Sequence, residues 1–306
     1  MIKDLKHFES NTYSQNGEDG VIREIFSRLK TSIELDRWCV EFGAWDGVYL
    51  SNTCRLIREE EYRAVLIEGD SKRVDKLLQN FPRDEVIKVC RFVGFEGENT
   101  IDRILSETPI PKDFDFLSVD IDGVDYYIFE SIRNYKPKVV CIEFNPSIPN
   151  EVDWVQDKNF NVKQGSSAKA LIRLAHSKDY ALVHTTACNL IFVRRDLEAF
   201  VVDHEKTIEE LNVAGNDPTY LFVGYDGTLL SNKRDVNLAW HGLKIHIDQL
   251  QPLPKALRVY GGDYRTFHRL IFAFWIGFRN PSWLFKKVKQ RIFSRVSRFI
   301  TRHPKK

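Results

Sequence analysis

Apolar residues recur along the first 200 positions in short continuous runs. These runs occupy 37–43, 64–70, 86–94, 114–120 and 137–145. Segments with helical spacing of apolar residues lie before or between them, at 20–30, 52–61, 71–80, 99–106 and 126–133. Continuous apolar strands that alternate with helices are typical of a parallel sheet covered on both faces. The pattern therefore predicts a doubly wound α/β fold.

Two more apolar runs, 180–186 and 189–195, follow a helical segment at 166–177. The link between these two runs is too short for the crossover that neighbouring parallel strands require. We therefore expect the two strands to pair antiparallel, so that the parallel sheet ends in a hairpin.

The composition is that of a folded protein, since 43% of the 306 residues are hydrophobic. A chain of this size can form one large domain, or one domain with an appendage. We divide it into a core at 1–200, an extension or lid packed on the core at 201–254, and a tail at 255–306. The five cysteines contain no CxxC pair, which favours reduced thiols over a zinc site or a disulfide framework. The charged start of the sequence does not resemble a secretory signal.

The tail differs from the rest of the chain in charge. Residues 255–306 contain 14 of the 45 Lys and Arg residues but only one of the 43 acidic residues. Apolar residues recur at helical spacing from Leu284 to Ile300, with basic residues between them. A basic amphipathic helix of this kind is typical of a segment that lies on an anionic membrane surface. Packing on the body and a dimer contact are the alternatives.

Nucleic acid is not favoured as a partner of the tail, because its aromatic residues follow the apolar stripe and do not interleave with the charges. The apolar run at 270–278 is too short to span a membrane. We accordingly expect a cytoplasmic protein that is peripheral at the inner face of the membrane.

The residues that end the first two strands are candidates for a cofactor site, because ligands of such sheets bind at the carboxyl ends of the strands. The first strand ends in EFGAWDG, with Glu41, Gly43 and Gly47. This is not the GxGxxG fingerprint of dinucleotide binding, although glycine does let the backbone approach a ligand closely. Glu68 ends the second strand, where an acid can accept hydrogen bonds from ribose hydroxyls. Together these residues predict an adenosine-containing cofactor without a pyrophosphate.

With these motifs the sequence resembles the class I S-adenosylmethionine-dependent methyltransferases, and among them the FkbM-like group, over residues 10–265. The resemblance rests on YSQNGEDGVI (13–22), VEFGAWDGVYLSNT (40–53), LIEGD (66–70), SVDIDGVDYY (118–127) and IEFNPSIP (142–149). It implies a Rossmann-like, seven-stranded sheet with S-adenosylmethionine over the first two strand ends. The cofactor residues that it implies are Glu41 and Gly43 in the methionine loop, Glu68 at the ribose, and Gln15, Glu18 and Asp120 as further lining.

Three aspartates, Asp120, Asp122 and Asp125, lie within six residues at the end of the fourth strand. Carboxylates this close repel one another unless something compensates for their charge. An EF-hand calcium loop is excluded, because its glycine belongs at the sixth position and here it comes at the fourth. A similarity to metal-dependent O-methyltransferases such as catechol O-methyltransferase suggests that Mg²⁺ or Mn²⁺ is held here. Its candidate ligands are Asp120, Asp122, Glu143 and Asn145.

A second interpretation needs no metal. In it, Asp122 and Gly123 shape a turn, Asp125 caps the next helix and only Asp120 faces the cleft. Methyl transfer then requires a general base, for which Asp120 and Glu143 are candidates.

Two histidines were also considered as the base. For His184 a structural role in a half-buried strand is the favoured interpretation. His241 is a catalytic candidate that could belong to a lid.

The sequence thus predicts an S-adenosylmethionine-dependent O-methyltransferase that acts on a hydroxyl of a glycan or a lipid-linked saccharide, with a divalent metal as a further option. One alternative is a metal-dependent glycosyltransferase that uses the DxD pair Asp120 and Asp122. Another is a non-catalytic, membrane-tethered protein on the same fold.

Overall fold

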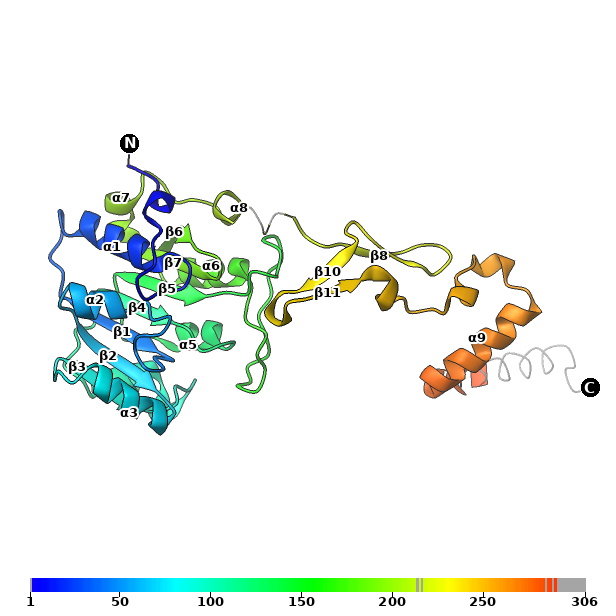
Figure 1. Cartoon of the computed structure of the whole chain (residues 1–306), viewed down its shortest axis with the longest axis horizontal. Helices are drawn as coiled ribbons and strands as arrows, with labels where there is room; N and C mark the ends of the chain where they lie inside the picture. Colours follow the sequence, from blue (N-terminus) through cyan, green and yellow to red (C-terminus); the bar gives the residue numbers. More distant parts are fainter. Residues whose placement is uncertain (1, 213–214, 216, 284, 288, 291–306) are drawn as a thin grey trace, which may run out of the picture. The chain divides into compact units, whose positions relative to one another are not determined.

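The computed structural model describes residues 2–212, 215, 217–283, 285–287 and 289–290 (Figure 1). The chain divides into two compact units, Met1–Pro218 and Thr219–Lys306. The boundary lies at Pro218 and not near residue 200, because Val201 and Ile208 belong to the hydrophobic core of the first unit.

The first unit contains a seven-stranded sheet in the order β3-β2-β1-β4-β5-β7-β6. Its strands are β1 (Trp38–Phe42), β2 (Arg63–Glu68), β3 (Val86–Cys90), β4 (Phe116–Val119), β5 (Val139–Glu143), β6 (Tyr180–Thr185) and β7 (Asn189–Arg194). The first five strands pair in parallel, whereas β7 pairs antiparallel with both β5 and β6. The predicted α/β sheet with its antiparallel hairpin is confirmed.

Helices cover both faces of this sheet, because side chains of successive strand residues point to opposite faces. One core joins the sheet to α4 (Ile101–Ser106), α5 (Asp125–Ser131), α6 (Ala168–Ser177) and α8 (Ile208–Leu211). The other joins it to α1 (Glu18–Leu29), α2 (Cys54–Glu59), α3 (Ser71–Asn80) and α7 (Glu198–Val201). The sheet is therefore doubly wound, as predicted.

The strand register brings the predicted site residues to one edge of the sheet. Phe42 pairs with Ile67 of β2 and with Val119 of β4, and Val119 pairs with Ile142 of β5. The carboxyl ends of β2, β1, β4 and β5 consequently lie at the same level. The switch in strand order, where ligands bind in sheets of this kind, lies between β1 and β4.

The second unit consists of two small hairpins and a helix. The hairpins pair β8 (Leu221–Val223) with β9 (Leu229–Ser231) and β10 (Asp235–Leu238) with β11 (Leu243–His246). The helix is α9 (Thr266–Arg279). Residues 281–283, 285–287 and 289–290 are also helical, and Asn280 caps this segment because its Oδ1 accepts a hydrogen bond from the Trp283 amide at 3.1 Å.

A buried charge pair joins three connections at the amino edge of the sheet. The Lys138 ammonium lies 2.9 Å from Oδ1 of Asp115, which is fully buried, and 2.6 Å from Oδ2 of Asp36. It also donates a hydrogen bond to the carbonyl of Asp113. Without the lysine, the Asp115 carboxylate would keep a charge in the core with no cation beside it.

We therefore expect Lys138→Met to lower the free energy of unfolding by about 3–5 kcal/mol, the usual effect of breaking a buried pair from one side. Lys136→Met is the matched control, since Lys136 meets Asp179 at 3.0 Å on the surface, where both side chains are exposed. An exposed pair contributes at most about 1 kcal/mol. Chemical denaturation measures both variants, and equal losses would contradict the role given to Lys138.

Candidate active site

The turn after β1 lies against the end of β4. Gly43 has φ +74°, and a Cβ atom at this position would lie 2.1 Å from the carbonyl oxygen of Asp120. No side chain fits in that space, and the left-handed backbone already favours glycine. Gly43 is therefore required for the close approach of this turn to the Asp120 carbonyl, and its contact with a cofactor stays a prediction.

Glu41 fixes the far end of the loop that begins at Gly43. Its side chain is buried at the end of β1, and Oε1 accepts a hydrogen bond from the Asn52 amide at 2.9 Å. Oε2 accepts hydrogen bonds from the hydroxyls of Ser51 at 2.6 Å and Thr53 at 2.7 Å. Burial raises the pKa of Glu41, and these three hydrogen bonds oppose that rise. Glu41 thus shapes the predicted methionine loop from beneath.

Glu68 connects the end of β2 to the same loop. Oε2 accepts a hydrogen bond from the Trp45 amide at 3.0 Å, and Oε1 accepts one from the Asp70 amide at 2.8 Å. Arg73 lies 3.9 Å from Oε2 and places its guanidinium 4.2 Å from the centroid of the Trp45 ring. The carboxylate predicted to meet the ribose is therefore held in one position by two strand ends.

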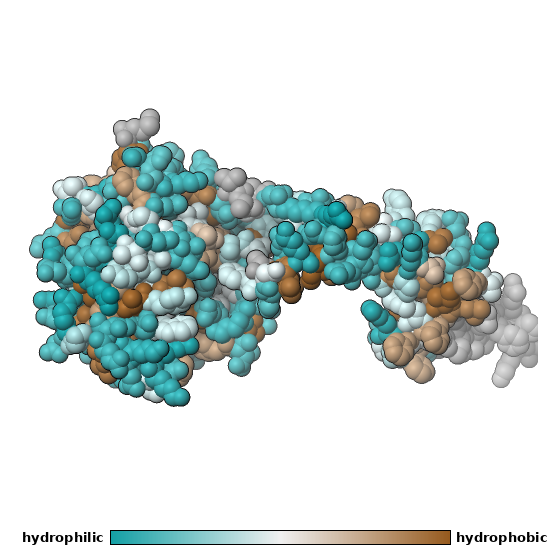
Figure 2. All heavy atoms as spheres, viewed as in Figure 1, coloured by the Kyte–Doolittle hydropathy of each residue, from teal (hydrophilic) through white to brown (hydrophobic). Residues whose placement is uncertain are grey.

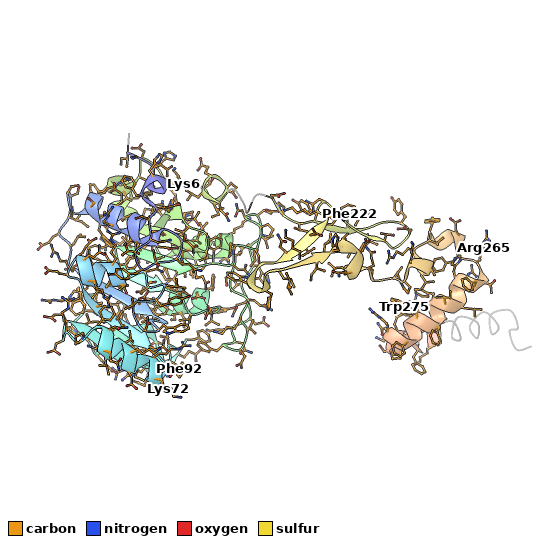
Figure 3. The ribbon with its side chains drawn as sticks, viewed as in Figure 1. Lys6, Lys72, Phe92, Phe222, Arg265 and Trp275 are labelled. Carbon is orange, nitrogen blue, oxygen red and sulfur yellow. The ribbon has the colours of Figure 1, made fainter. Side chains whose placement is uncertain are left out.

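Phe92 was not identified from the sequence. Its side chain is 73% exposed and is labelled in Figure 3. Its ring packs against Gly69, where an added Cβ atom would be 2.2 Å from Cδ1 of the phenylalanine. The predicted strand 86–94 ends at Cys90, so Phe92 belongs to the connection that follows β3. The signal for Phe92 in the sequence is an aromatic residue near the carboxyl end of the predicted strand 86–94.

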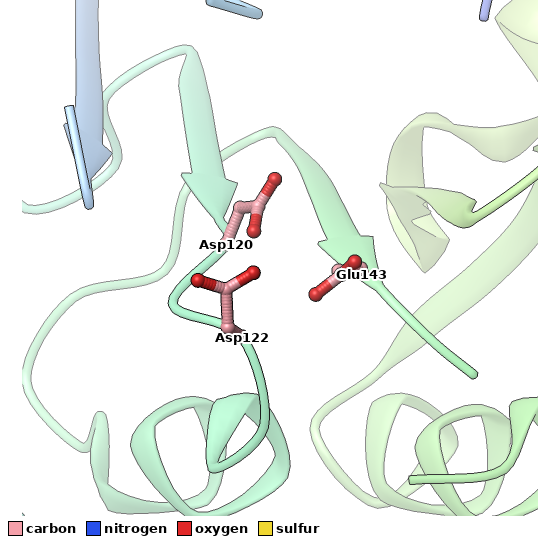
Figure 4. A group of neighbouring side chains, drawn as sticks. All are labelled: Asp120, Asp122 and Glu143. Carbon is pink, nitrogen blue, oxygen red and sulfur yellow. The ribbon is translucent and has the colours of Figure 1, made fainter. Parts of the chain in front are cut away.

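The carboxylates of Asp120, Asp122 and Glu143 converge (Figure 4). One oxygen from each group lies within 4.8 Å of the others. Asp120 and Asp122 come from the turn after β4, where Asp122 has φ +58°, and Glu143 is the last residue of β5. Geometry thus brings together three of the four predicted metal ligands.

Asp125 is separate from this cluster and holds the turn that presents it. Its carboxylate accepts hydrogen bonds from the amides of Ile121 and Gly123, each at 2.8 Å. Asp125 is the first residue of α5, whose N-cap is Val124, so Asp125 is not the cap residue we predicted. The cap prediction is wrong because the side chain folds back on the preceding turn.

The three clustered carboxylates destabilise one another's charged forms. Burial and the neighbouring acids, Asp120 first among them, raise the pKa of Glu143 to about 9. Burial, Asp125 and Asp122 raise the pKa of Asp120 to about 7. Lys163 opposes the rise at Glu143 and donates a hydrogen bond to the Ile121 carbonyl at 3.0 Å. A proton or a cation at the cluster would relieve this repulsion.

Asn145, the fourth predicted ligand, is engaged in the following loop. Its Oδ1 accepts hydrogen bonds from the amide and the hydroxyl of Ser147, at 2.9 and 2.6 Å. Its Nδ2 donates to the carbonyl of Gln164 at 2.7 Å. A ligand role for Asn145 stays a prediction that requires Oδ1 to exchange these hydrogen bonds for a metal.

Two residues predicted to line the cofactor site, Glu18 and Gln15, lie in different surroundings. Glu18 is fully buried, with Oε1 bonded to the Thr186 hydroxyl at 2.5 Å and to Nδ2 of Asn189 at 3.0 Å. Because Asn189 pairs with Glu143 in the sheet, Glu18 supports the site from below. Gln15 is exposed. Their contact with a cofactor stays a prediction.

The two histidines differ in position. His184 is buried in β6 with Nε2 3.0 Å from Oε1 of Glu9, which supports the structural interpretation. Burial lowers the pKa of this imidazole. His241 lies in a short 3₁₀ turn, Ala239–His241, of the second unit. Its catalytic role stays a prediction.

Comparison with known families decides the class of protein. Residues 97–182 match the family model of the methyltransferase FkbM domain. The chain is a methyltransferase with a match to the FkbM domain over these residues. The matched segment runs from the turn before α4 to β6 and includes the whole carboxylate cluster. The predicted family and the predicted enzyme class, an S-adenosylmethionine-dependent methyltransferase, are confirmed.

Among curated proteins, none matches the sequence of this chain. Solved structures with a similar fold include TrmK of M. capricolum, in complex with S-adenosylhomocysteine, at 12% identity and a TM-score of 0.35, over 56% of this chain and 67% of that one. An O-methyltransferase from Bacillus cereus, also in complex with S-adenosylhomocysteine, has 16% identity and a TM-score of 0.37, over 56% and 80%. An Aquifex aeolicus methyltransferase has 12% identity and a TM-score of 0.35, over 61% and 94%.

The contact between the loop after β1 and the end of β4 can be tested directly in this methyltransferase. We expect Gly43→Ala to lower the free energy of unfolding by at least about 2 kcal/mol more than Gly97→Ala. Gly97 is a matched control, because its φ is +71° but nothing lies within 4 Å of its added Cβ atom. The loss of stability in Gly97→Ala therefore reports only the strain of a left-handed backbone, without a steric clash. Equal losses in urea denaturation would show that the Asp120 carbonyl does not restrict residue 43.

Proposed function

We propose that this methyltransferase transfers the methyl group of S-adenosylmethionine to a hydroxyl of a glycan or a lipid-linked saccharide. The observation that carries the proposal is the group of three carboxylates at the ends of β4 and β5, beside the glycine turn that ends β1. In a sheet with this strand order, a cofactor over β1 and β2 places its reactive end toward β4.

The ends of β1 and β2 support the cofactor part of the proposal. Each oxygen of Glu68 accepts one backbone hydrogen bond and keeps a second lone pair for a ribose hydroxyl. The exposed ring of Phe92 packs against Gly69, the residue that follows Glu68. This ring offers a flat apolar surface for an adenine base. Gly43 leaves room for the backbone to approach the rest of the cofactor.

The chemistry is an in-line displacement. The acceptor oxygen forms a bond to the methyl carbon while the carbon–sulfur bond breaks, and S-adenosylhomocysteine leaves with the electron pair. The hydroxyl proton passes to a carboxylate, for which Asp120 and Glu143 are the candidates. Most of the catalytic effect then comes from positioning the two reactants and from this proton transfer.

The cluster also fits a divalent metal. Carboxylate oxygens are the ligands that Mg²⁺ and Mn²⁺ prefer, and Asp120, Asp122 and Glu143 supply three within 4.8 Å. A bound cation would lower the pKa of an acceptor hydroxyl and offset the repulsion among the carboxylates. The three side chains would hold the cation.

The loop that follows β5 supports a saccharide as the acceptor. It packs on the carboxylate turn, since a Cβ atom at Gly123 would lie 2.9 Å from the Val162 carbonyl. On this loop Phe160 is 44% exposed and stacks on Phe95 with the ring centroids 4.4 Å apart. Exposed aromatic rings beside carboxylates offer an apolar face and hydrogen-bond acceptors together, as the two sides of a sugar ring require.

Isothermal titration calorimetry tests the cofactor assignment. We expect the full chain to bind S-adenosylmethionine and S-adenosylhomocysteine but not uridine diphosphate. Binding of uridine diphosphate in their place would favour the glycosyltransferase alternative, and binding of none of the three would favour a non-catalytic role.

The same titration tests Glu68. We expect Glu68→Ala to weaken S-adenosylhomocysteine binding at least about tenfold, because a hydrogen bond to a charged group is worth about 1.5–3 kcal/mol. Glu85→Ala is the control, since Glu85 is exposed just before β3, at the opposite edge of the sheet. Unchanged affinity in a folded Glu68→Ala variant would remove Glu68 from the ribose role.

Metal binding is tested without reference to activity by titrating the chain with Mn²⁺. We expect Asp122→Asn to weaken the binding at least about tenfold, because a charged ligand is lost. Asparagine tolerates the left-handed backbone at this position, so the turn is retained. Asp75→Asn, on the exposed face of α3, is the control. Equal Mn²⁺ affinities, or full methyl transfer in the presence of a chelator, would contradict the metal site.

A further inference from the structure

Helix α9 of the second unit has an exposed apolar face. Phe267, Leu270, Phe274 and Phe278 are 64%, 67%, 82% and 88% exposed. Their spacings of three, four and four residues place them on one side of the helix. We call these four residues the α9 stripe. Four large apolar side chains on one side are more than scattered surface residues, and such a patch marks an interaction site.

The stripe is distinct from the face by which α9 packs within its own unit. On that other face, the ring of Phe272 lies 6.3 Å from Tyr264 and 5.9 Å from Trp283, measured between centroids. Trp275 lies 6.3 Å from Phe272. The side chains of this face are half-buried. The helix therefore needs no further partner there, and the stripe is left as a second apolar face.

The charge around the stripe has a single sign. The sequence contains no acidic residue from Tyr264 onward. Arg265 is the N-cap of α9, Arg269 and Arg279 are exposed on the helix outside the stripe, and Lys286 and Lys287 follow in the next helical segment. Figure 2 shows the apolar side chains gathered over α9, and Figure 3 shows Arg265 at the start of the helix. An apolar stripe on a basic helix is complementary to a surface that carries negative charge and has an apolar interior.

We propose that the α9 stripe docks into the interface of an anionic lipid membrane, with the helix parallel to the membrane plane. A helix of this length extends about 21 Å, whereas the hydrocarbon core of a bilayer is about 30 Å thick. In the described part of the chain, no helix combines the length and the apolar character that a membrane span requires. An amphipathic basic helix lies in the interface, with its apolar side chains among the lipids and its cations at the headgroups.

The proposed membrane contact, helix α9, lies earlier in the chain than the amphipathic segment predicted from the sequence. The apolar positions predicted from Leu284 to Ile300 lie largely outside the described residues, whereas the α9 stripe lies within them. A second exposed apolar segment, β8, is less suited to an anionic membrane, because the turn after it carries the acidic Asp226. The inference does not depend on the proposed acceptor or cofactor.

Vesicle sedimentation of the full chain tests the proposal. We expect binding to vesicles of phosphatidylglycerol with phosphatidylcholine, no binding to phosphatidylcholine alone, and weaker binding at high salt. Phe274→Ser together with Phe278→Ser should lower the partition coefficient at least about tenfold, because the variant lacks two rings that would insert among the lipids. Phe222→Ser together with Tyr225→Ser is the matched control, since both residues are exposed aromatics of the same unit outside the stripe, and it should bind as the unchanged protein does.

Three results would overturn the proposal. The first is unchanged binding of the Phe274 and Phe278 double variant, and the second is absence of binding by the unchanged chain. The third is a dimer, measured by light scattering, that the same double variant dissociates, because a second copy of the chain would then cover the stripe. The affinity for S-adenosylhomocysteine, measured on the same variant, should not change, so failure here is distinct from failure of the proposed function.

Discussion

The position of the active site depends on one close contact between backbones, that of Gly43 with the carbonyl oxygen of Asp120. β1 and β4 are neighbours at the switch in strand order, and the connections that leave them run to opposite faces of the sheet. At that point the turn after β1 can approach the end of β4 only if residue 43 has no side chain. The contact therefore joins the loop that begins at Gly43 to the turn that contains Asp120 and Asp122. The proposed methyl transfer requires both segments, the first for the cofactor and the second for the acceptor hydroxyl.

The acids around this contact divide into two groups by their partners. The carboxylate oxygens of Glu41 and Glu68 accept hydrogen bonds from backbone amides and side-chain hydroxyls, and these bonds hold the loop after β1 in position. Asp120, Asp122 and Glu143 face one another, and burial together with their mutual repulsion raises the pKa of Asp120 and Glu143. Buried carboxylates are stable when they are hydrogen-bonded. The second group is more exposed, and the mutual repulsion of its carboxylates makes it the group suited to a proton, a metal or an acceptor hydroxyl.

Much of the fold could be predicted from the sequence, because continuous apolar runs identify buried strands. The helix at Ser71–Asn80 was predicted with its observed bounds, since Asp70 caps it by accepting a hydrogen bond from the Lys72 amide. The strand predicted to reach residue 94 ends at Cys90, because β3 is an edge strand with a single neighbour. The strand ends also gave the candidate site residues, whose contacts with cofactor, metal or acceptor stay predictions. What the sequence could not give is the direction of each carboxylate, so the framing role of Glu18 and the turn made by Asp125 emerged only in three dimensions.

The measurement that tests the central claim most directly is a crystal structure of the full chain with S-adenosylhomocysteine. The account predicts that the ribose hydroxyls donate hydrogen bonds to Glu68, that the homocysteine lies over the turn at Gly43, and that the sulfur faces the cluster of Asp120, Asp122 and Glu143. S-adenosylhomocysteine bound away from the carboxyl ends of β1 and β2, or with its sulfur directed away from β4, would contradict it.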